Sequence, residues 1–125
     1  MHIVRRAALA VVGFAFVGTA ALAQDAAKVD PRHYKVQFEN DRVRVLRIHY
    51  GPHESSVMHS HPDSVVTYLT PAHTRFTLPN GKTIESSGKA GTTAFAPAGS
   101  HKPTNLSGQP MDAVLVELKG HGPAK

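Results

Sequence analysis

Turn-forming residues divide most of this sequence into short runs that are rich in β-branched and aromatic residues. Gly51-Pro52, Thr70-Pro71, Asn80-Gly81 and Pro97 each end or interrupt such a run, and no stretch after residue 23 has convincing helical periodicity. Closely spaced turns between short strands are typical of an antiparallel sandwich or barrel. We therefore predict one all-β domain over residues 32–119, with strands in residues 33–38, 42–50, 65–69, 73–78, 82–85, 92–96 and 111–119.

Local patterns within these runs give more specific expectations. Asn80-Gly81 predicts a hairpin with a type I′ turn, because both central residues of that turn need positive φ. The second run alternates arginine with valine, which predicts a strand with one solvated, charged face that carries Arg42, Arg44 and Arg47. The last run alternates in the same way and presents an apolar face through Val114, Val116 and Leu118.

The first 23 residues have the pattern of a secretory signal peptide. Arg5 and Arg6 form a short basic region, residues 7–23 are uncharged and apolar, and Ala21-Leu22-Ala23 is an A-x-A cleavage site. The alternative is an uncleaved membrane anchor, for which the apolar run is short. We expect a periplasmic or secreted protein without membrane attachment after cleavage, in which residues 24–31 are a flexible lead-in and residues 120–125 a loose tail.

Composition excludes several functional classes. The chain has no cysteine, so disulfides and thiol chemistry are not available. The formal net charge of +5 falls to +3 when Arg5 and Arg6 are removed, and the remaining basic residues are scattered, so nucleic acid is not an expected partner. A domain this small must depend on its hydrophobic core, aided by a metal or a partner subunit.

A pair of histidines, His59 and His61, is the main candidate for a functional site. Alternate side chains of a strand point to one face, so both imidazoles of His59-Ser60-His61 can converge on one point. Neutral imidazole is a common metal ligand, and His101 is the obvious third one if the two segments meet in the fold. The alternative is a pair of surface histidines at a strand end beside a proline turn.

The two histidine segments resemble the two motifs of the cupin superfamily. His59-Ser60-His61 matches the His-x-His of the first motif, and the second motif is matched by Gly91, Pro97-Ala98-Gly99, His101 and Asn105. The similarity covers residues 36–119 and is strongest to small single-domain cupins with His-Ser-His-Pro-Asp in the first motif. It implies a double-stranded β-helix (jelly-roll) barrel, a homodimer paired through edge strands, and an inward-facing site for a divalent ion (Fe, Ni, Cu, Mn or Zn) on His59, His61 and His101.

The chain also departs from the cupin motifs. The glutamate of the first motif should fall at Val65 or Val66, neither of which can bind a metal, and the second motif is one residue short between Gly99 and His101. The three histidine ligands of the cupin motifs therefore have counterparts in this chain, whereas the glutamate ligand has none. Such a neutral ligand set would leave the charge of the ion uncompensated, which favours a small anionic substrate such as an enolate or a carboxylate.

Three further residues are possible pocket or accessory residues. In a continuous strand, Asp63 would point to the same face as the two histidines. It is either a carboxylate ligand placed later in the motif or a cap for its own loop. Tyr68 either presents its hydroxyl to the pocket or packs in the core. Asn105 opens a formal glycosylation sequon, but its motif position favours a structural hydrogen bond. Outside this set, His49 and His53 are expected to be exposed, and no partner is evident for His33, His73 and His121.

Two hypotheses for the function follow. The first is an exported metal-dependent enzyme, an oxygenase or isomerase that acts on a small anionic molecule. The second is a non-catalytic periplasmic cupin that binds a small ligand or a metal, with a degenerate site because valine replaces the glutamate of the first motif.

Overall fold

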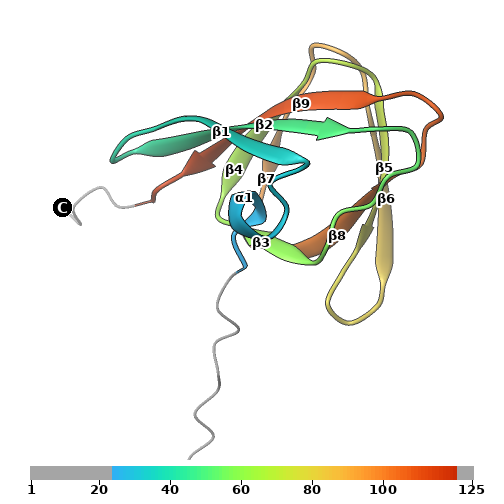
Figure 1. Cartoon of the computed structure of the whole chain (residues 1–125), viewed down its shortest axis with the longest axis horizontal. Helices are drawn as coiled ribbons and strands as arrows, with labels where there is room; N and C mark the ends of the chain where they lie inside the picture. Colours follow the sequence, from blue (N-terminus) through green and yellow to red (C-terminus); the bar gives the residue numbers. More distant parts are fainter. Residues whose placement is uncertain (1–23, 121–125) are drawn as a thin grey trace, which may run out of the picture.

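The computed structural model describes residues 24–120, which form an antiparallel β-barrel preceded by a single helical turn (Figure 1). One sheet has the strand order β1-β2-β9-β4-β7 and the other the order β3-β8-β5-β6. The elements are α1 (Ala26–Val29), β1 (Tyr34–Glu39), β2 (Val43–Tyr50), β3 (His59–His61), β4 (Ser64–Tyr68), β5 (Ala72–Thr77), β6 (Thr83–Gly88), β7 (Thr93–Ala96), β8 (Gly99–Asn105) and β9 (Met111–Leu118). The predicted all-β class is confirmed.

Strand β8 is the main element that the sequence did not indicate. It contains Gly99 and Pro103, which are turn signals rather than strand signals, yet it runs from Gly99 to Asn105 between β3 and β5. This strand carries His101 in register with His59 of β3. The pairing of two short strands thus joins the two histidine segments.

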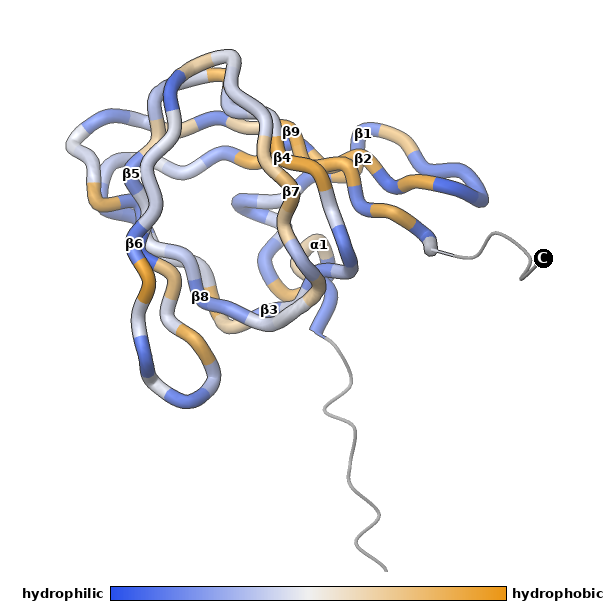
Figure 2. The backbone as a smooth tube through the Cα atoms, turned by 180° about the vertical axis from the view of Figure 1, so that it is seen from behind, coloured by the Kyte–Doolittle hydropathy of each residue, from blue (hydrophilic) through white to orange (hydrophobic). Residues whose placement is uncertain are grey.

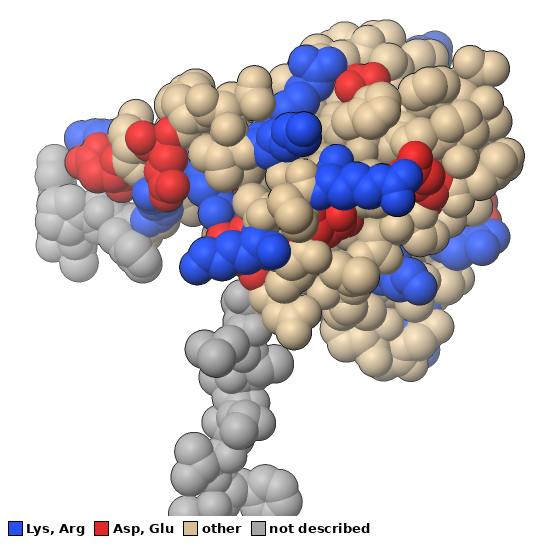
Figure 3. Space-filling model, viewed as in Figure 1, with Lys and Arg blue, Asp and Glu red and all other residues tan. Residues whose placement is uncertain are grey.

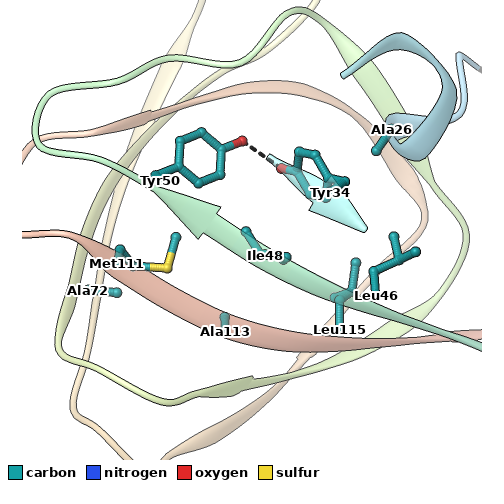
Figure 4. Packing of buried hydrophobic residues seen from close by; sticks show 9 residues of the cluster. All are labelled: Ala26, Tyr34, Leu46, Ile48, Tyr50, Ala72, Met111, Ala113 and Leu115. Atoms are coloured by element: carbon teal, nitrogen blue, oxygen red, sulfur yellow. Dashed lines mark hydrogen bonds between the residues drawn. The ribbon is translucent and has the colours of Figure 1, made fainter. Parts of the chain in front are cut away.

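The inner face of the larger sheet forms the core of the barrel. Figure 4 shows the buried apolar side chains of β2 and β9 pointing to the same side, with the hydroxyls of Tyr34 and Tyr50 hydrogen-bonded at 2.7 Å. The two strands are in register, Leu46 opposite Leu115 and Ile48 opposite Ala113. The buried cluster consists of Ala26, Tyr34, Leu46, Ile48, Tyr50, Ala72, Met111, Ala113 and Leu115.

The predicted solvated face of β2 was wrong at Arg44. Arg44 shares the inward face with Leu46, while Val45 faces outward opposite Val116. The side chain of Arg44 is only 16% exposed, because two carboxylates neutralise its charge inside the barrel. The outer face of β9 is therefore the one that carries Val114, Val116 and Leu118. On β2, Arg44 does not belong to a solvated face.

Residues 24–31, expected to be a flexible lead-in, pack against the barrel beside β3 (Figure 1). Asp25 caps α1 by accepting a hydrogen bond from the backbone N–H of Ala27 at 2.9 Å, and Ala26 is fully buried. The carbonyl of Gln24 accepts a hydrogen bond from the backbone N–H of Ser60 at 2.7 Å. The signal peptide expected in residues 1–23 and residues 121–125 of the expected tail lie outside the described residues.

The hairpin between β5 and β6 is present, but its turn is not type I′. Among the non-glycine residues described, only His53 has positive φ, so Asn80 lacks the conformation that a type I′ turn requires. The N–H of Gly81 donates to the carbonyl of Leu78 at 2.9 Å, which places Pro79 and Asn80 at the centre of the turn, and Gly81 follows with φ +83°. Because its ring fixes φ near −65°, Pro79 favours this turn with a left-handed glycine after it.

The surface in the view of Figure 1 carries basic and acidic side chains interspersed with one another (Figure 3). Ion pairs such as Arg47–Asp112 at 3.1 Å account for part of this mixing. Within residues 24–120, no helix has the length and apolar character needed to cross a bilayer.

Candidate metal centre

Three imidazoles converge where β3 pairs with β8. His59 lies directly opposite His101, and His61 follows two residues later on the same face of β3. The ring centroids are 4.7 Å apart for His59–His61, 5.1 Å for His59–His101 and 5.4 Å for His61–His101. One nitrogen of each ring lies within 4.8 Å of the nitrogens of the other two, so the three residues form a group that could hold one metal ion. The predicted convergence is confirmed.

His59 has a free nitrogen inside the protein. Its Nδ1 lies 2.8 Å from the carbonyl oxygen of Val57, which can only accept, so Nδ1 carries the proton. Its Nε2 is buried and has no hydrogen-bond partner among the described residues. Leaving a buried lone pair unsatisfied is unfavourable, and a metal ion is a partner that satisfies it.

His61 is oriented by a buried carboxylate. Its Nδ1 donates to Oε2 of Glu117 on β9 at 2.7 Å, so Nε2 is the nitrogen that carries the free lone pair in the neutral ring. The side chain of Glu117 is 3% exposed and that of His61 is 8% exposed, so water barely competes for this bond. A carboxylate that accepts the second N–H of a metal-binding histidine fixes its tautomer and raises its basicity.

Glu117 is held in turn by Arg44. Nε of Arg44 donates to Oε1 of Glu117 at 2.7 Å, and Nη1 and Nη2 form a bidentate pair with Asp25 at 2.6 and 2.8 Å. Burial acts to raise the pKa of Glu117, but the hydrogen bonds from His61 and Arg44 outweigh it and hold this pKa below its usual value. The hydrogen bond from Arg44 likewise lowers the pKa of Asp25.

Burial keeps two of the three imidazoles neutral. Desolvation and the neighbouring His61 lower the pKa of His59 to about 4. Desolvation is the largest cause that lowers the pKa of His101 to about 3, and electrostatic repulsion by His59 and His61 adds to it. Both rings therefore offer lone pairs at neutral pH, which is the form that binds metals.

A second polar cluster lies behind His59 and gives His33 the partners that were not evident in the sequence. Nδ1 of His33 lies 2.7 Å from Oδ2 of Asp30, and its Nε2 lies 2.6 Å from Oε2 of Glu54. Ser56 joins this cluster to the site, because its Oγ donates to Asp30 and lies 3.1 Å from Nδ1 of His59. The cluster supports the loop that leads into β3.

The three accessory residues have different roles. Asp63 is exposed and its Oδ1 accepts the backbone N–H of Ala98 at 2.8 Å, so it braces the loop between β7 and β8 and is not part of the histidine group. Asn105 is 1% exposed and donates to the carbonyls of Gly51 and Gln109 at 3.0 and 2.8 Å, which is the structural role expected for it. Tyr68 packs against the core and also lines the cavity described next.

A cavity of about 510 Å³ lies inside the barrel beside the histidines. His61 and His101 line one part of it, and side chains from both sheets, such as Val66, Phe76 and Met111, line the rest. The three-histidine group thus borders a space of the size that small-molecule sites have in proteins.

Comparison with known proteins agrees with this architecture. A cupin domain from Bordetella pertussis Tohama I has 28% sequence identity and a TM-score of 0.64, covering 70% of this chain and 92% of that domain. The chain has the cupin fold. No protein-family model matches the sequence, and a search of the curated proteins finds no match.

Other proteins of known structure share the cupin fold with this chain. An uncharacterized conserved protein with a double-stranded β-helix domain from Klebsiella pneumoniae has 26% identity and a TM-score of 0.56, covering 72% of this chain and 78% of that one. An RmlC-like cupin family protein from Methanocaldococcus jannaschii has 13% identity and a TM-score of 0.54, covering 68% and 77%. At that low identity the likeness shows the fold alone.

The sequence interpretation missed Glu117 and Arg44. Met111, Ala113, Leu115 and Glu117 alternate along the inward face of β9. The sequence signal for a buried, functional Glu117 was therefore a carboxylate in a position where the alternation predicts an apolar residue. This glutamate comes from the last strand and approaches His61 from behind, at Nδ1. It is therefore not equivalent to the missing metal-binding glutamate, whose expected positions hold Val65 and Val66.

Proposed function

We propose that this chain binds one divalent metal ion through His59, His61 and His101 and acts with it on a small anionic molecule, as an oxygenase or isomerase. The observation that supports it best is Nε2 of His59, which is buried without a partner beside two further imidazoles. A bound ion of this kind supplies Lewis-acid polarisation of a ligand oxygen, and imidazole ligands suit iron, nickel, copper or zinc, with manganese as a further candidate.

The residues around the ligands support this proposal. Val57 and Glu117 accept the Nδ1 protons of His59 and His61, so both rings keep Nε2 for an ion. Neither imidazole brings a negative charge, and Glu117 is already neutralised by Arg44. An anionic ligand would therefore supply the charge that the three histidines lack.

Metal analysis of protein purified without a histidine tag tests the proposal. We expect about one equivalent of a divalent metal, a loss of most of it in His101→Ala, and no loss in Lys102→Ala. Lys102 is the matched control because it is the next residue of β8 and is exposed. Sub-stoichiometric metal that His101→Ala leaves unchanged would contradict the proposal.

A non-catalytic cupin that binds a small ligand or a metal is the second candidate. It is favoured by the absence of a carboxylate from the histidine group, since Val66 packs against the core and Val65 lies on the opposite face of β4. Oxygen uptake or substrate conversion by protein with full metal occupancy would decide for the enzyme. Full occupancy without turnover of any candidate substrate would decide for the binding protein.

We also propose that the chain is exported and cleaved after Ala23, on the strength of the sequence pattern of residues 1–23. Cleavage there would leave Gln24, whose carbonyl bonds to Ser60, as the first residue of the barrel domain. N-terminal sequencing of the protein from a periplasmic fraction should begin at Gln24. A chain that retains Met1 would contradict cleavage.

We further propose a homodimer, supported by an apolar row across the outer face of the larger sheet. Cross-strand pairing aligns Phe38, Val45, Val116, Val65 and Phe95 over its five strands, and Phe38 and Phe95 are 55% and 59% exposed. Figure 2 shows the apolar colouring along β4, β7 and β9. A second copy could cover this row with its own in a two-fold arrangement. Sedimentation at micromolar concentration should show a dimer that Phe95→Glu dissociates and Glu85→Gln does not; a monomeric wild type would refute it.

A further inference from the structure

The cavity beside the histidines has no charged wall. Within residues 24–120, no Asp, Glu, Lys or Arg lines it, although such residues make up 18% of the chain. Its walls are apolar side chains from both sheets, including Ile48, Val66, Phe76, Met111 and Leu115. A charged group on a ligand in this space would lose its hydration without gaining a counter-charge.

Seven described residues of the cavity wall carry hydroxyls, namely Tyr34, Tyr50, Ser64, Tyr68, Thr74, Ser86 and Ser100. Several of these hydroxyls already have protein partners, among them that of Ser100, which pairs with Ser60. The hydroxyls of Tyr34 and Tyr50 bond to each other at 2.7 Å, and Ser64 donates to the carbonyl of Pro62 at 2.7 Å. Apart from these seven residues and the two histidines, the described lining is apolar. A sugar or another polyhydroxylated ligand would therefore leave many of its hydroxyls unpaired. A ligand that complements this wall is therefore apolar over the part that occupies the cavity.

The histidines are the part of the cavity wall where a bound metal ion would attract an anion. His61 and His101 lie on the wall, and the set that they form with His59 brings no negative charge to an ion. A ligand oxyanion at that position would compensate the ion in surroundings of low dielectric constant. A second charged group elsewhere on the ligand would meet only apolar wall.

We infer that the ligand of this site is a monoanion with one carboxylate or enolate oxygen directed to the histidines and an uncharged aromatic or alicyclic ring in the cavity. The inference rests on the proposed metal centre and adds the chemistry of the rest of the ligand. A volume of about 510 Å³ suits a ring system better than a small acid such as acetate. Ile84 on β6 is 54% exposed and lines the cavity, and an apolar ring would cover it.

Three probes of graded chemistry test the inference on the full mature chain loaded with Zn²⁺, whose occupancy is measured first. 1-Naphthoate has both features, 1-naphthalenemethanol has the ring without the charge, and acetate has the charge without the ring. By calorimetry, naphthoate should bind at least about tenfold more tightly than either of the others. Removal of zinc with a chelator should weaken naphthoate by about tenfold and leave the alcohol unchanged.

Neighbouring positions on β7 supply a matched pair of variants. Ala94 lies opposite Val66 on the inner face and lines the cavity, whereas Thr93 lies opposite Thr67 on the outer face. Ala94→Leu should fill ring space and weaken naphthoate by about tenfold at unchanged zinc occupancy. Thr93→Leu adds the same side chain outside and should leave naphthoate affinity as in the wild type.

The outcomes separate this inference from the proposed metal centre. Full zinc occupancy with acetate as tight as naphthoate would overturn the apolar body and leave the metal centre standing. Full occupancy with the alcohol as tight as naphthoate would overturn the anionic head group in the same way. Failure to take up zinc would overturn the proposed function itself, and the head-group assignment with it.

Discussion

Glu117, in the last strand, accepts a hydrogen bond at 2.7 Å from Nδ1 of His61, which lies 56 residues earlier in the chain. The opposite oxygen of the same carboxylate accepts Nε of Arg44 at 2.7 Å. One buried carboxylate therefore orients a candidate metal ligand and neutralises an inward-facing arginine. Its removal should affect metal affinity and stability by different routes.

Glu117→Gln should lower metal affinity by about 10- to 100-fold, because the neutral amide no longer increases the basicity of His61. Competition with a chromophoric chelator measures this change. Glu85→Gln is the control, since Glu85 is exposed and pairs with the exposed His73. Equal affinities of Glu117→Gln and wild type would show that the carboxylate does not support the metal.

Arg44→Met should destabilise the metal-free protein by about 3 kcal/mol, because it leaves Glu117 buried beside His61 without its cation. Arg47→Met, on the outer face of the same strand, should change stability by less than about 0.5 kcal/mol because its partner contact is exposed. Urea unfolding of both variants measures the difference. Similar losses in the two would contradict an inward role for Arg44.

Leu46→Ala should cost about 2–5 kcal/mol, since Leu46 is fully buried against Leu115 and its loss leaves a cavity. Val36→Ala should cost much less, because Val36 is 46% exposed on the edge strand β1. Thermal or urea unfolding compares the two. A small effect at Leu46 would mean that the barrel collapses around the gap.

The metal-free protein should lose stability as the pH falls below 6.5. The folded-state pKa values of about 4 for His59 and about 3 for His101 lie below the ordinary value of 6.5, so only the unfolded chain binds these protons between pH 6.5 and 4. This contribution is therefore complete above pH 6.5 and is lost on acidification.

Urea unfolding with a chelator at pH 7 and pH 5 measures this loss. His101→Gln should show a smaller decrease than the wild type, because one of the two groups no longer titrates. His73→Gln, at an exposed position, should behave as the wild type does. A wild-type protein that is equally stable at both pH values would contradict neutral, desolvated imidazoles.

The all-β class, most strand positions and the three histidines could be predicted from the sequence, because they depend on local properties. Strands and turns reflect residue preferences over a few positions, and the His-x-His spacing places two imidazoles on one face of any strand. The pairing of His101 with His59 was expected from the resemblance to cupins, and the register of β3 and β8 confirms it.

The face of each strand that points inward could be known only from the folded protein. Alternation identifies two faces but not which one is buried, and here both faces of β2 and β9 carry valine or leucine. Arg44 and Glu117 lie on the inner face because they neutralise each other there, with Asp25 completing the pair from a segment before β1. Such compensation depends on contacts between residues far apart in the chain, and no local pattern encodes it.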